Sequence, residues 1–233
     1  MNPNEHGKRV SGLFDNIAAW YDFLNHFLSV GQDVYWRRRL VRYVRSGPTG
    51  AVLDLAAGTL DVSVELLRQN PALRVLSLDF SRAMLCRGKA KIAKHPAIIP
   101  VQADGRALPL PDGCVDTVTI AFGIRNILPR TDAYKEILRV LAPGGRLCIL
   151  EFGTGQARIW QGAYNFYLGT VLPKIGRFFS KNPEAYQYLA DTIRAFPNAR
   201  TLAAELLDAG FATVSYEPLS SGIVYIHVAQ KPS

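Results

Sequence analysis

The stretch AVLDLAAGTLDV, residues 51–62, decides the fold of this chain. An apolar run over residues 51–55, interrupted by Asp54, predicts a short buried strand. Small residues then turn the chain, and the apolar spacing of residues 61–68 predicts a helix. A strand, a small-residue turn and a helix together place a cofactor at the carboxyl end of a parallel strand.

The acidic residues around this turn indicate which cofactor would suit it. The next predicted strand, Arg74–Leu78, is followed by Asp79, which could hydrogen-bond a ribose. A dinucleotide would place its pyrophosphate on the helix N-terminus, but there it would meet Asp61 and Asp54. The third glycine of a dinucleotide fingerprint is also absent, so the pattern favours S-adenosylmethionine, with its ribose, amino-acid tail and positive sulfonium. The alternative is a strand-turn-helix of another α/β fold.

Length and composition predict one domain in a reducing compartment. The 233 residues contain no run of about 18 apolar residues, and the first residues are too polar for a secretory signal. Three widely separated cysteines, Cys86, Cys114 and Cys148, lack the paired spacing of a metal site. We therefore expect a cytoplasmic protein with buried thiols and no bound metal.

The net charge of +8 is concentrated in two places. Five arginines between residues 37 and 45 lie opposite an apolar stripe of Trp36, Leu40 and Val44, which predicts a basic amphipathic helix. That face would be solvated or would contact an anionic lipid surface. No acidic residue lies between Glu151 and Glu184. The cations form no continuous stripe, so we expect no nucleic-acid partner.

After residue 50, strands and helices alternate, as in a doubly wound parallel sheet. Strands are predicted over Ala51–Leu55, Arg74–Leu78, Ile98–Gln102, Val115–Ala121 and Arg146–Leu150, and helices over Val62–Gln69, Arg82–Lys94 and Thr131–Leu141. Pro143-Gly144-Gly145 predicts a tight turn into the fifth strand. A helical region, a helix over Ala199–Ala209 and an antiparallel pair over Phe211–Leu219 and Ile223–Ala229 follow.

These elements predict a single α/β domain with a seven-stranded, mostly parallel, Rossmann-like sheet of the class I S-adenosylmethionine methyltransferase type. Residues 1–50 form N-terminal helices, and residues 51–151 form the cofactor-binding core. A helical cap over residues 152–197 follows the fifth strand, and residues 198–233 close the sheet.

Motifs along nearly the whole chain resemble one family, the quinone-biosynthesis C-methyltransferases that methylate demethylmenaquinol or a ubiquinone precursor. The matching stretches include Phe14-Asp15-Asn16-Ile17-Ala18, Trp20-Tyr21-Asp22, Val52-Leu53-Asp54-Leu55-Ala56, Asp79-Phe80-Ser81, Phe122-Gly123-Ile124-Arg125-Asn126, Leu150-Glu151-Phe152 and Tyr186 with Tyr188-Leu189. The strand-four motif Phe-Gly-x-Arg-Asn is the most specific of them.

The resemblance implies a set of cofactor-binding residues. Thr59 would bind the cofactor in the turn, Asp79 would hold its ribose, and Asp104 with Gly105 would lie near the adenine. The full expected set is Asp54, Gly58, Thr59, Asp79, Asp104, Gly105 and Ala121. The family usually has glycine at position 60 and often serine at position 121, where this chain has Leu60 and Ala121. Because Leu60 falls where the helix starts, we expect it to adopt right-handed backbone angles.

Methylation of a ring carbon requires an electron-rich ring, so the reduced quinol rather than the quinone is the expected substrate. Arg125 is the candidate that stabilises the ionised hydroxyl; the alternative is a structural ion-pair partner. Proton removal would use a water held by Arg125 and Asn126, or a nearby Asp22, Tyr21 or His26. The resemblance favours Arg125, Asn126 and Tyr21 with water as the proton carrier.

Alternatives from other classes remain open. An amino-group methyltransferase usually carries Asn/Asp-Pro-Pro-Tyr after strand four, where this chain has Ala121-Phe122-Gly123-Ile124. A catalytically silent cofactor-binding protein would bind without turnover. Between the two quinol classes we favour demethylmenaquinol because menaquinone is the more widespread bacterial product. The acid-free cap suggests peripheral contact with the membrane, and a homo-oligomer is left open.

Overall fold

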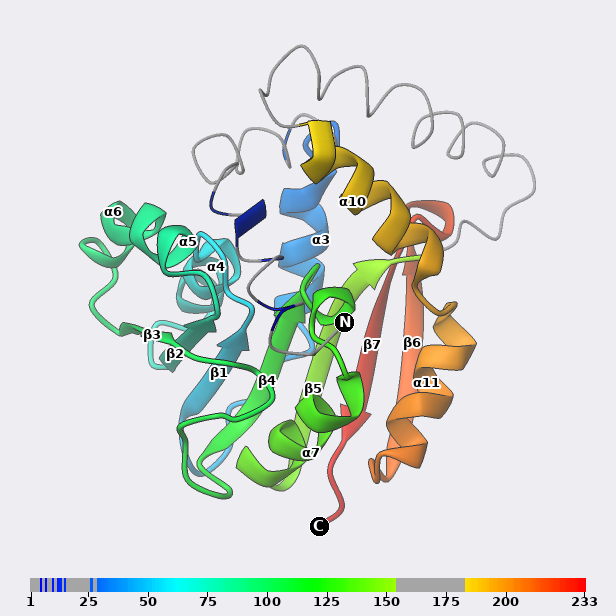
Figure 1. Cartoon of the computed structure of the whole chain (residues 1–233). Helices are drawn as coiled ribbons and strands as arrows, with labels where there is room; N and C mark the ends of the chain where they lie inside the picture. Colours follow the sequence, from blue (N-terminus) through cyan, green and yellow to red (C-terminus); the bar gives the residue numbers. More distant parts are fainter. Residues whose placement is uncertain are drawn as a thin grey trace.

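A seven-stranded sheet forms the centre of the molecule (Figure 1). The computed structural model describes residues 5, 7, 10, 12, 13, 15, 26, 29–153 and 183–233. The strands are β1 Ala51–Leu55, β2 Arg74–Asp79, β3 Ile98–Gln102, β4 Val115–Ala121, β5 Leu141–Phe152, β6 Thr213–Leu219 and β7 Val224–Gln230. Their order across the sheet is β3-β2-β1-β4-β5-β7-β6.

The first five strands are parallel and β7 runs antiparallel to both of its neighbours. The predicted seven-stranded, mostly parallel sheet is therefore confirmed. The strand order reverses direction between β1 and β4, so their carboxyl ends form the switch point at which open α/β sheets bind ligands.

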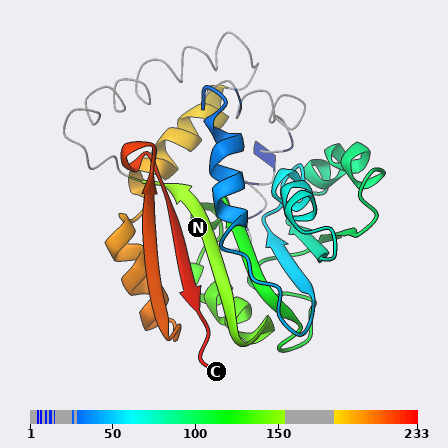
Figure 2. The same ribbon diagram turned by 180° about the vertical axis from the view of Figure 1, so that it is seen from behind.

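Helices cover both faces of the sheet (Figures 1 and 2). Their bounds are α3 Gln32–Val41, α4 Asp61–Gln69, α5 Arg82–Arg87, α6 Lys89–Ile92, α7 Arg130–Val140, α10 Pro183–Ala195 and α11 Ala199–Asp208. One face of the sheet packs against α7 and α11, and the other packs against α3 and α4. Side chains alternate along each strand. Leu53 and Leu55 therefore pack into the core under α7 and α11, while Val52 packs into the core under α3 and α4.

Two element boundaries differ from the prediction. The helix expected over residues 82–94 is two short helices that meet at Gly88. Strand β5 begins at Leu141, because Pro143-Gly144-Gly145 lies inside it as an irregularity where the pairing with β4 shifts register. A Cβ at Gly145 would lie 2.8 Å from the carbonyl oxygen of Ala142 and 3.0 Å from that of Asp116, so glycine allows this close strand approach.

The arginines of residues 37–45 do not form the single basic face that we expected. Trp36 and Leu40 are buried as the apolar stripe of α3. Arg37, however, pairs with Asp33 and Asp61, and Arg39 pairs with Glu217 at 2.6 Å. The pair of Arg37 with Asp33 is a local i,i+4 pair of α3, whereas the pairs with Asp61 and Glu217 come from tertiary packing, which the local spacing could not show.

The thiols also depart partly from expectation. Cys148 is buried and Cys114 is half-buried, but Cys86 is exposed on α5. The prediction of a buried thiol at Cys86 is wrong, because this short helix turns that position outward.

The region after β5 is described only from α10 onward. Residues 154–182, which contain most of the predicted cap and its acid-free stretch, lie outside the described residues. None of the helices in the described ranges is long and apolar enough to cross a membrane.

Candidate active site

A pocket opens at the carboxyl ends of the central strands, at the switch point of the sheet. Its lining comes from the turn after β1, the end of β2, the loop after β3 and the segment after β4. The described lining residues are Gly7, Val10, Leu55, Ala56, Gly58, Asp79, Phe80, Ser81, Met84, Ala103, Asp104, Gly105, Arg106, Ala121, Phe122, Gly123, Asn126, Ile127 and Leu128. Of the expected cofactor set, the pocket brings together Gly58, Asp79, Asp104, Gly105 and Ala121.

Asp79, at the end of β2, is fixed by two backbone donors. Its Oδ2 accepts a hydrogen bond of 2.7 Å from the N–H of Gly58, and its Oδ1 accepts one of 2.8 Å from the N–H of Ser81. Burial raises the pKa of this carboxyl to about 6 despite these donors. Each oxygen retains a lone pair, so the carboxylate can accept further hydrogen bonds from hydroxyls in the pocket.

The turn after β1 uses left-handed backbone angles at three positions. These are Ala56 with φ 55°, Gly58 with φ 54° and Leu60 with φ 73°. The expectation of right-handed angles at Leu60 is wrong: its ψ is 22°, and it precedes the first residue of α4. A left-handed non-glycine residue costs about 1–3 kcal/mol, and the complete burial of the Leu60 side chain offsets that cost.

Thr59, within this turn, and Asp54, in β1, are not among the described lining residues. Thr59 is buried, and its carbonyl oxygen accepts a hydrogen bond of 2.8 Å from Lys91 Nζ. Asp54 accepts hydrogen bonds from the hydroxyls of Ser63 at 2.6 Å and Thr119 at 2.9 Å. Burial raises the pKa of Asp54 to about 7. Hydrogen bonds thus fix Asp54 within β1 and Thr59 within the turn.

Asp104 and Gly105 lie on the opposite wall, after β3. Asp104 Oδ2 is 2.6 Å from Arg106 Nη2, and the Arg106 guanidinium lowers the pKa of this carboxyl. A Cβ at Gly105 would lie 3.1 Å from Cδ1 of Ile127, so the absence of a side chain keeps this wall open.

The segment after β4 contributes a third wall. Gly123 passes so close to Ala56 that a Cβ at position 123 would overlap the Cβ of that alanine. Asn126 lines the pocket, and its Oδ1 accepts a hydrogen bond of 3.1 Å from the hydroxyl of Tyr188 on α10. Asn126 therefore connects the pocket to the helix that follows the predicted cap.

Arg125 is buried next to this wall in an ion pair. Its Nη1 lies 2.6 Å from Glu151 Oε1 and donates a further hydrogen bond of 2.6 Å to the carbonyl oxygen of Phe122. Its Nε has no hydrogen-bond partner among the described residues. Burial raises the pKa of Glu151 although Arg125 opposes that shift. Arg125 is not among the described lining residues, and the predicted catalytic residues Tyr21 and Asp22 lie outside the described part of the chain.

Sequence reasoning did not select several residues that the structure places at the site. Phe80, Ser81 and Met84 line the pocket next to Asp79, and Ser81 Oγ donates a hydrogen bond to Asp15. The family-like stretch Asp79-Phe80-Ser81 was the available signal for the first two. Glu151 was visible as a charged residue ending an apolar strand, but its pairing with Arg125 depends on the neighbouring strands β4 and β5.

The charges of the pocket suit a cofactor with a ribose and a cationic sulfonium. Among the described lining residues Arg106 is the one Lys or Arg, and Asp104 neutralises it. The lining also contains Asp79, whose carboxylate can accept hydrogen bonds from ribose hydroxyls. A pyrophosphate would find no unpaired cation among these described residues, whereas S-adenosylmethionine fits them.

The sheet topology and the position of the pocket define the fold, which is the Rossmann-like fold of the class I methyltransferases. A structure of an S-adenosylmethionine-dependent methyltransferase from Thermotoga maritima is similar, with a TM-score of 0.68 at 14% identity, covering 95% of this chain and 99% of that one. The complex of the Haloferax volcanii Trm112 activator with a methyltransferase gives a TM-score of 0.67 at 15% identity, covering 94% and 98%. These likenesses show the fold.

The family follows from sequence similarity over nearly the entire chain. The profile of the ubiE/COQ5 methyltransferase family matches residues 2–231, and the chain belongs to that family. It is 42% identical over 231 residues to the ubiquinone/menaquinone biosynthesis C-methyltransferase UbiE of Geobacter sulfurreducens, covering 97% of this chain and 90% of that protein. It is 43% identical over 223 residues to the demethylmenaquinone methyltransferase of Mycobacterium tuberculosis, covering 96% and 92%.

Proposed function

We propose that this protein transfers a methyl group from S-adenosylmethionine to a ring carbon of a prenylated quinol, with demethylmenaquinol as the substrate. The observation that carries the proposal is the pocket at the switch point, with the Asp79 carboxylate fixed by Gly58 and Ser81, in a chain of the ubiE/COQ5 family. Relatives named for ubiquinone/menaquinone C-methylation and for demethylmenaquinone methylation support this class of substrate.

In this proposal the walls of the pocket hold the cofactor. Asp79 accepts hydrogen bonds from the ribose, while Asp104 and Gly105 lie against the adenine. The turn at Gly58, supported by Asp54 and Thr59, shapes the floor, and Ala121 ends β4 beside it. When bound, the cofactor supplies a methyl group on a good leaving group, so the protein has to orient the quinol and make it electron-rich.

The quinol becomes nucleophilic at carbon when one hydroxyl is ionised, and we assign that task to Asn126 in the pocket lining and to Arg125 next to it. The buried Nε of Arg125 has no partner among the described residues, and a buried donor without a partner is costly. A substrate oxygen or a water that carries its proton away would satisfy it. Tyr21 and Asp22 remain candidates for orienting that water.

A naphthoquinol has a second, fused ring that a benzoquinol lacks, and the relatives carry names for both classes. We place demethylmenaquinol first and keep the ubiquinone precursor as the alternative. Because either substrate carries an isoprenoid tail, we further propose that the protein works in the cytoplasm and contacts the membrane surface peripherally. The acid-free stretch between Glu151 and Glu184 supports this contact.

The direct test is turnover with purified protein. Demethylmenaquinol and the demethylated benzoquinol, each kept reduced in detergent, are incubated with methyl-labelled S-adenosylmethionine, and the products are identified by mass spectrometry. We expect label on the ring carbon of the naphthoquinol. Cofactor binding without label transfer to either quinol would identify a silent binder, and a bacterial strain lacking the gene would show which demethylated quinone accumulates.

A further inference from the structure

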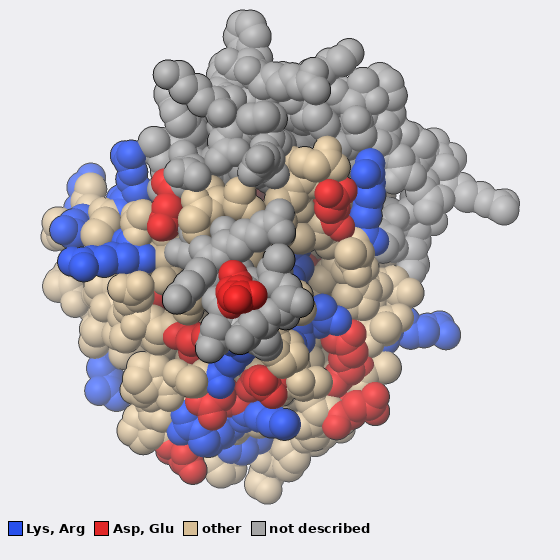
Figure 3. Space-filling view, in the orientation of Figure 1, with Lys and Arg blue, Asp and Glu red and all other residues tan. Residues whose placement is uncertain are grey.

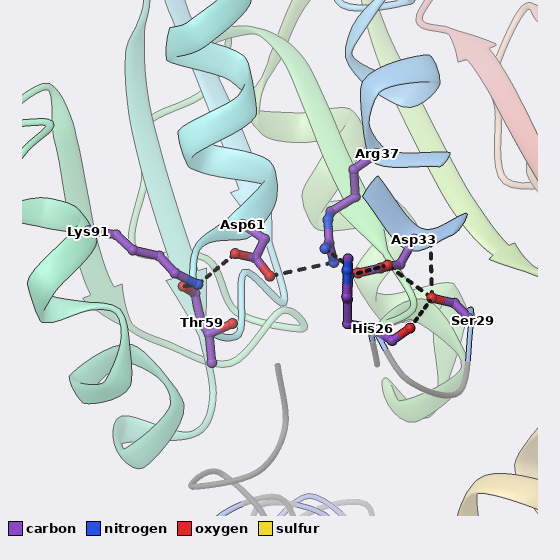
Figure 4. Close-up of polar contacts among 7 residues, drawn as sticks. All are labelled: His26, Ser29, Asp33, Arg37, Thr59, Asp61 and Lys91. Carbon is purple, nitrogen blue, oxygen red and sulfur yellow. Dashed lines mark hydrogen bonds and ion pairs between the residues drawn. The ribbon is translucent and has the colours of Figure 1, made fainter. Parts of the chain in front are cut away.

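Four alternating charges run from α6 past the start of α4 to α3: Lys91, Asp61, Arg37 and Asp33 (Figure 4). Their side chains are 28%, 29%, 14% and 4% exposed, in that order. A chain of ion pairs with this degree of burial is screened by salt less than exposed surface pairs are. The chain joins three elements that are separate in the sequence.

One end of this chain holds the cofactor turn. Lys91 Nζ donates to Asp61 Oδ1 at 2.6 Å and to the carbonyl oxygen of Thr59 at 2.8 Å. Asp61 is the first residue of α4 and follows Leu60, which is held in the left-handed conformation. Lys91 and Asp61 therefore fix the backbone on both sides of the strained residue.

The other end lies on α3. Arg37 Nη1 is 3.5 Å from Asp61 Oδ2, while its Nη2 donates to Asp33. Asp33 is itself held: its Oδ1 accepts a hydrogen bond of 2.9 Å from Ser29 Oγ and lies 3.0 Å from Nδ1 of His26 (Figure 4). Arg37 thus stands between two carboxylates, one of them anchored in α3 and the other at the cofactor turn.

We propose that Asp61 and Arg37 are positioning residues that brace the cofactor turn against α3, so that cofactor affinity depends on an arginine outside the described pocket lining. This inference rests on the proposed function, because the turn matters only if Gly58 and Asp79 hold a cofactor. Arg37 reaches the turn through Asp61. Among the described residues, removing the Arg37 charge leaves Asp61 held from the Lys91 side alone, and the Thr59–Asp61 backbone can then relax away from the strained geometry at Leu60.

Calorimetric titration of the full-length protein with S-adenosylmethionine tests the proposal. We expect Arg37→Met to weaken affinity about tenfold, a coupling of the size found between residues that share one ion-pair network. Asp61→Asn should weaken affinity at least as much. The decisive measurement is Arg37→Met in the Asp61→Asn background, where we expect no further loss because the path from Arg37 to the turn is already broken.

A matched control is Lys135 on α7, whose exposed side chain is not among the described lining residues of the pocket. Lys135→Met removes one positive charge, as Arg37→Met does, and should leave affinity unchanged. If Arg37→Met does not fold, Arg37→Gln, which keeps a polar planar group, replaces it in the same scheme.

The outcomes distinguish failure of the proposed function from failure of the positioning role. Wild-type protein that binds no cofactor would overturn the proposed function. Normal wild-type binding with unchanged affinity in Arg37→Met, whatever its melting temperature, would overturn the positioning role alone. Equal losses for Arg37→Met with and without Asp61→Asn would also overturn it, since Arg37 would then act by another route.

Discussion

At the scale of single residues, the most informative position is Leu60. The backbone there is left-handed, yet the residue is a leucine whose side chain is fully buried. A Cβ at Gly88 would lie 2.5 Å from Cδ1 of Leu60, so the glycine between α5 and α6 provides the space that this side chain fills. Leu60 and Gly88 are therefore a matched pair, and the glycine is needed for its small size rather than for its backbone freedom, because its φ is −71°.

This pairing predicts the effect of Gly88→Ala. An alanine at an ordinary helix boundary stabilises or is neutral. Here we expect it to lower the free energy of unfolding by about 1–3 kcal/mol, because the added methyl group overpacks the site of Leu60. Urea denaturation measures the change, and in a Leu60→Ala background the cost of Gly88→Ala should shrink. An equal cost in both backgrounds would show that the two residues are independent.

The second prediction at this scale concerns Asp79 and pH. Burial holds its pKa at about 6, so the carboxylate becomes protonated as the pH falls through 6 and loses the charge that favours donors such as ribose hydroxyls. Cofactor affinity should therefore fall as the pH is lowered from 7 to 5.

The matched variants are Asp79→Asn and Asp79→Ala, with affinities from calorimetric titration across this pH range. At pH 7 we expect Asp79→Ala to weaken binding by about 1–3 kcal/mol. Asp79→Asn should flatten the dependence of cofactor affinity on pH. The dependence that remains in this variant would come from Asp54, whose pKa is about 7. An unchanged pH slope in Asp79→Asn would remove Asp79 from the binding site.

At the scale of elements, the carboxyl ends of β4 and β5 are joined by a buried ion pair. Arg125 follows β4, and Glu151 lies near the end of β5, with the Arg125 guanidinium also 5.4 Å from the centre of the Phe152 ring. Both side chains are almost fully buried. The pair holds the segment that carries Asn126 at the wall of the pocket. Arg125 can therefore serve the reaction by positioning Asn126 as well as by donating hydrogen bonds itself.

We expect Arg125→Lys to abolish most turnover on demethylmenaquinol while leaving cofactor affinity intact. Lysine keeps the charge and can replace one donor, but it lacks the planar guanidinium, whose Nη1 serves Glu151 and the Phe122 carbonyl oxygen and whose Nε is left for a further acceptor. Methyl transfer and calorimetric titration measure the two effects separately.

The control for this substitution is Arg130→Lys. Arg130 on α7 pairs with Glu205 through Nε at 3.0 Å and Nη2 at 2.7 Å, so it loses the same fork away from the pocket. Arg130→Lys should keep near-normal turnover. Near-normal turnover in Arg125→Lys would contradict the role proposed for Arg125.

At the scale of the whole molecule, the positive charge is distributed unevenly. In Figure 3 acidic and basic side chains alternate over the lower part of the visible face, while basic atoms gather at the left, where α5 and α6 lie. Four exposed cations belong to that region: Arg82, Arg87, Lys89 and Lys94. The other acid-poor region, with Arg158, Lys174, Arg177 and Lys181, lies outside the described residues.

These two regions give a prediction about membrane contact. We expect the protein to co-sediment with vesicles in proportion to their anionic lipid and to be released by salt, since each cation near the surface contributes about 1 kcal/mol. Changing Arg158, Lys174, Arg177 and Lys181 together to glutamine should reduce binding.

The comparison variant changes Arg82, Arg87, Lys89 and Lys94, which lie on α5, on α6 and just after α6, to glutamine and so removes the same amount of charge. We expect it to bind almost as well as the wild type. Loss of binding in this variant alone would place the contact on α5 and α6 instead of the cap, and equal binding to neutral and anionic vesicles would exclude an electrostatic contact.

The sequence by itself determined the sheet and the place of its pocket. Alternating apolar runs and helical spacings are local signals, and the expected strands correspond to those of the structure within a few residues apart from the start of β5. Asp79 was recognisable because it ends a predicted parallel strand, and the carboxyl ends of parallel strands share one edge of the sheet; β2 lies next to β1, beside the switch point. Motifs along the chain indicated the family because each motif is a set of a few residues that are neighbours in the sequence.

Only the tertiary structure decided how residues from distant segments meet. Leu60 is left-handed because the turn between β1 and α4 requires it and because Gly88, 28 positions later, makes room for its side chain. Arg125 lies against Glu151 because β4 and β5 are neighbours in the sheet, and Arg37 reaches Asp61 because α3 packs beside α4. Ion pairs and packing of this kind depend on distances between elements, which local periodicity and propensity do not encode.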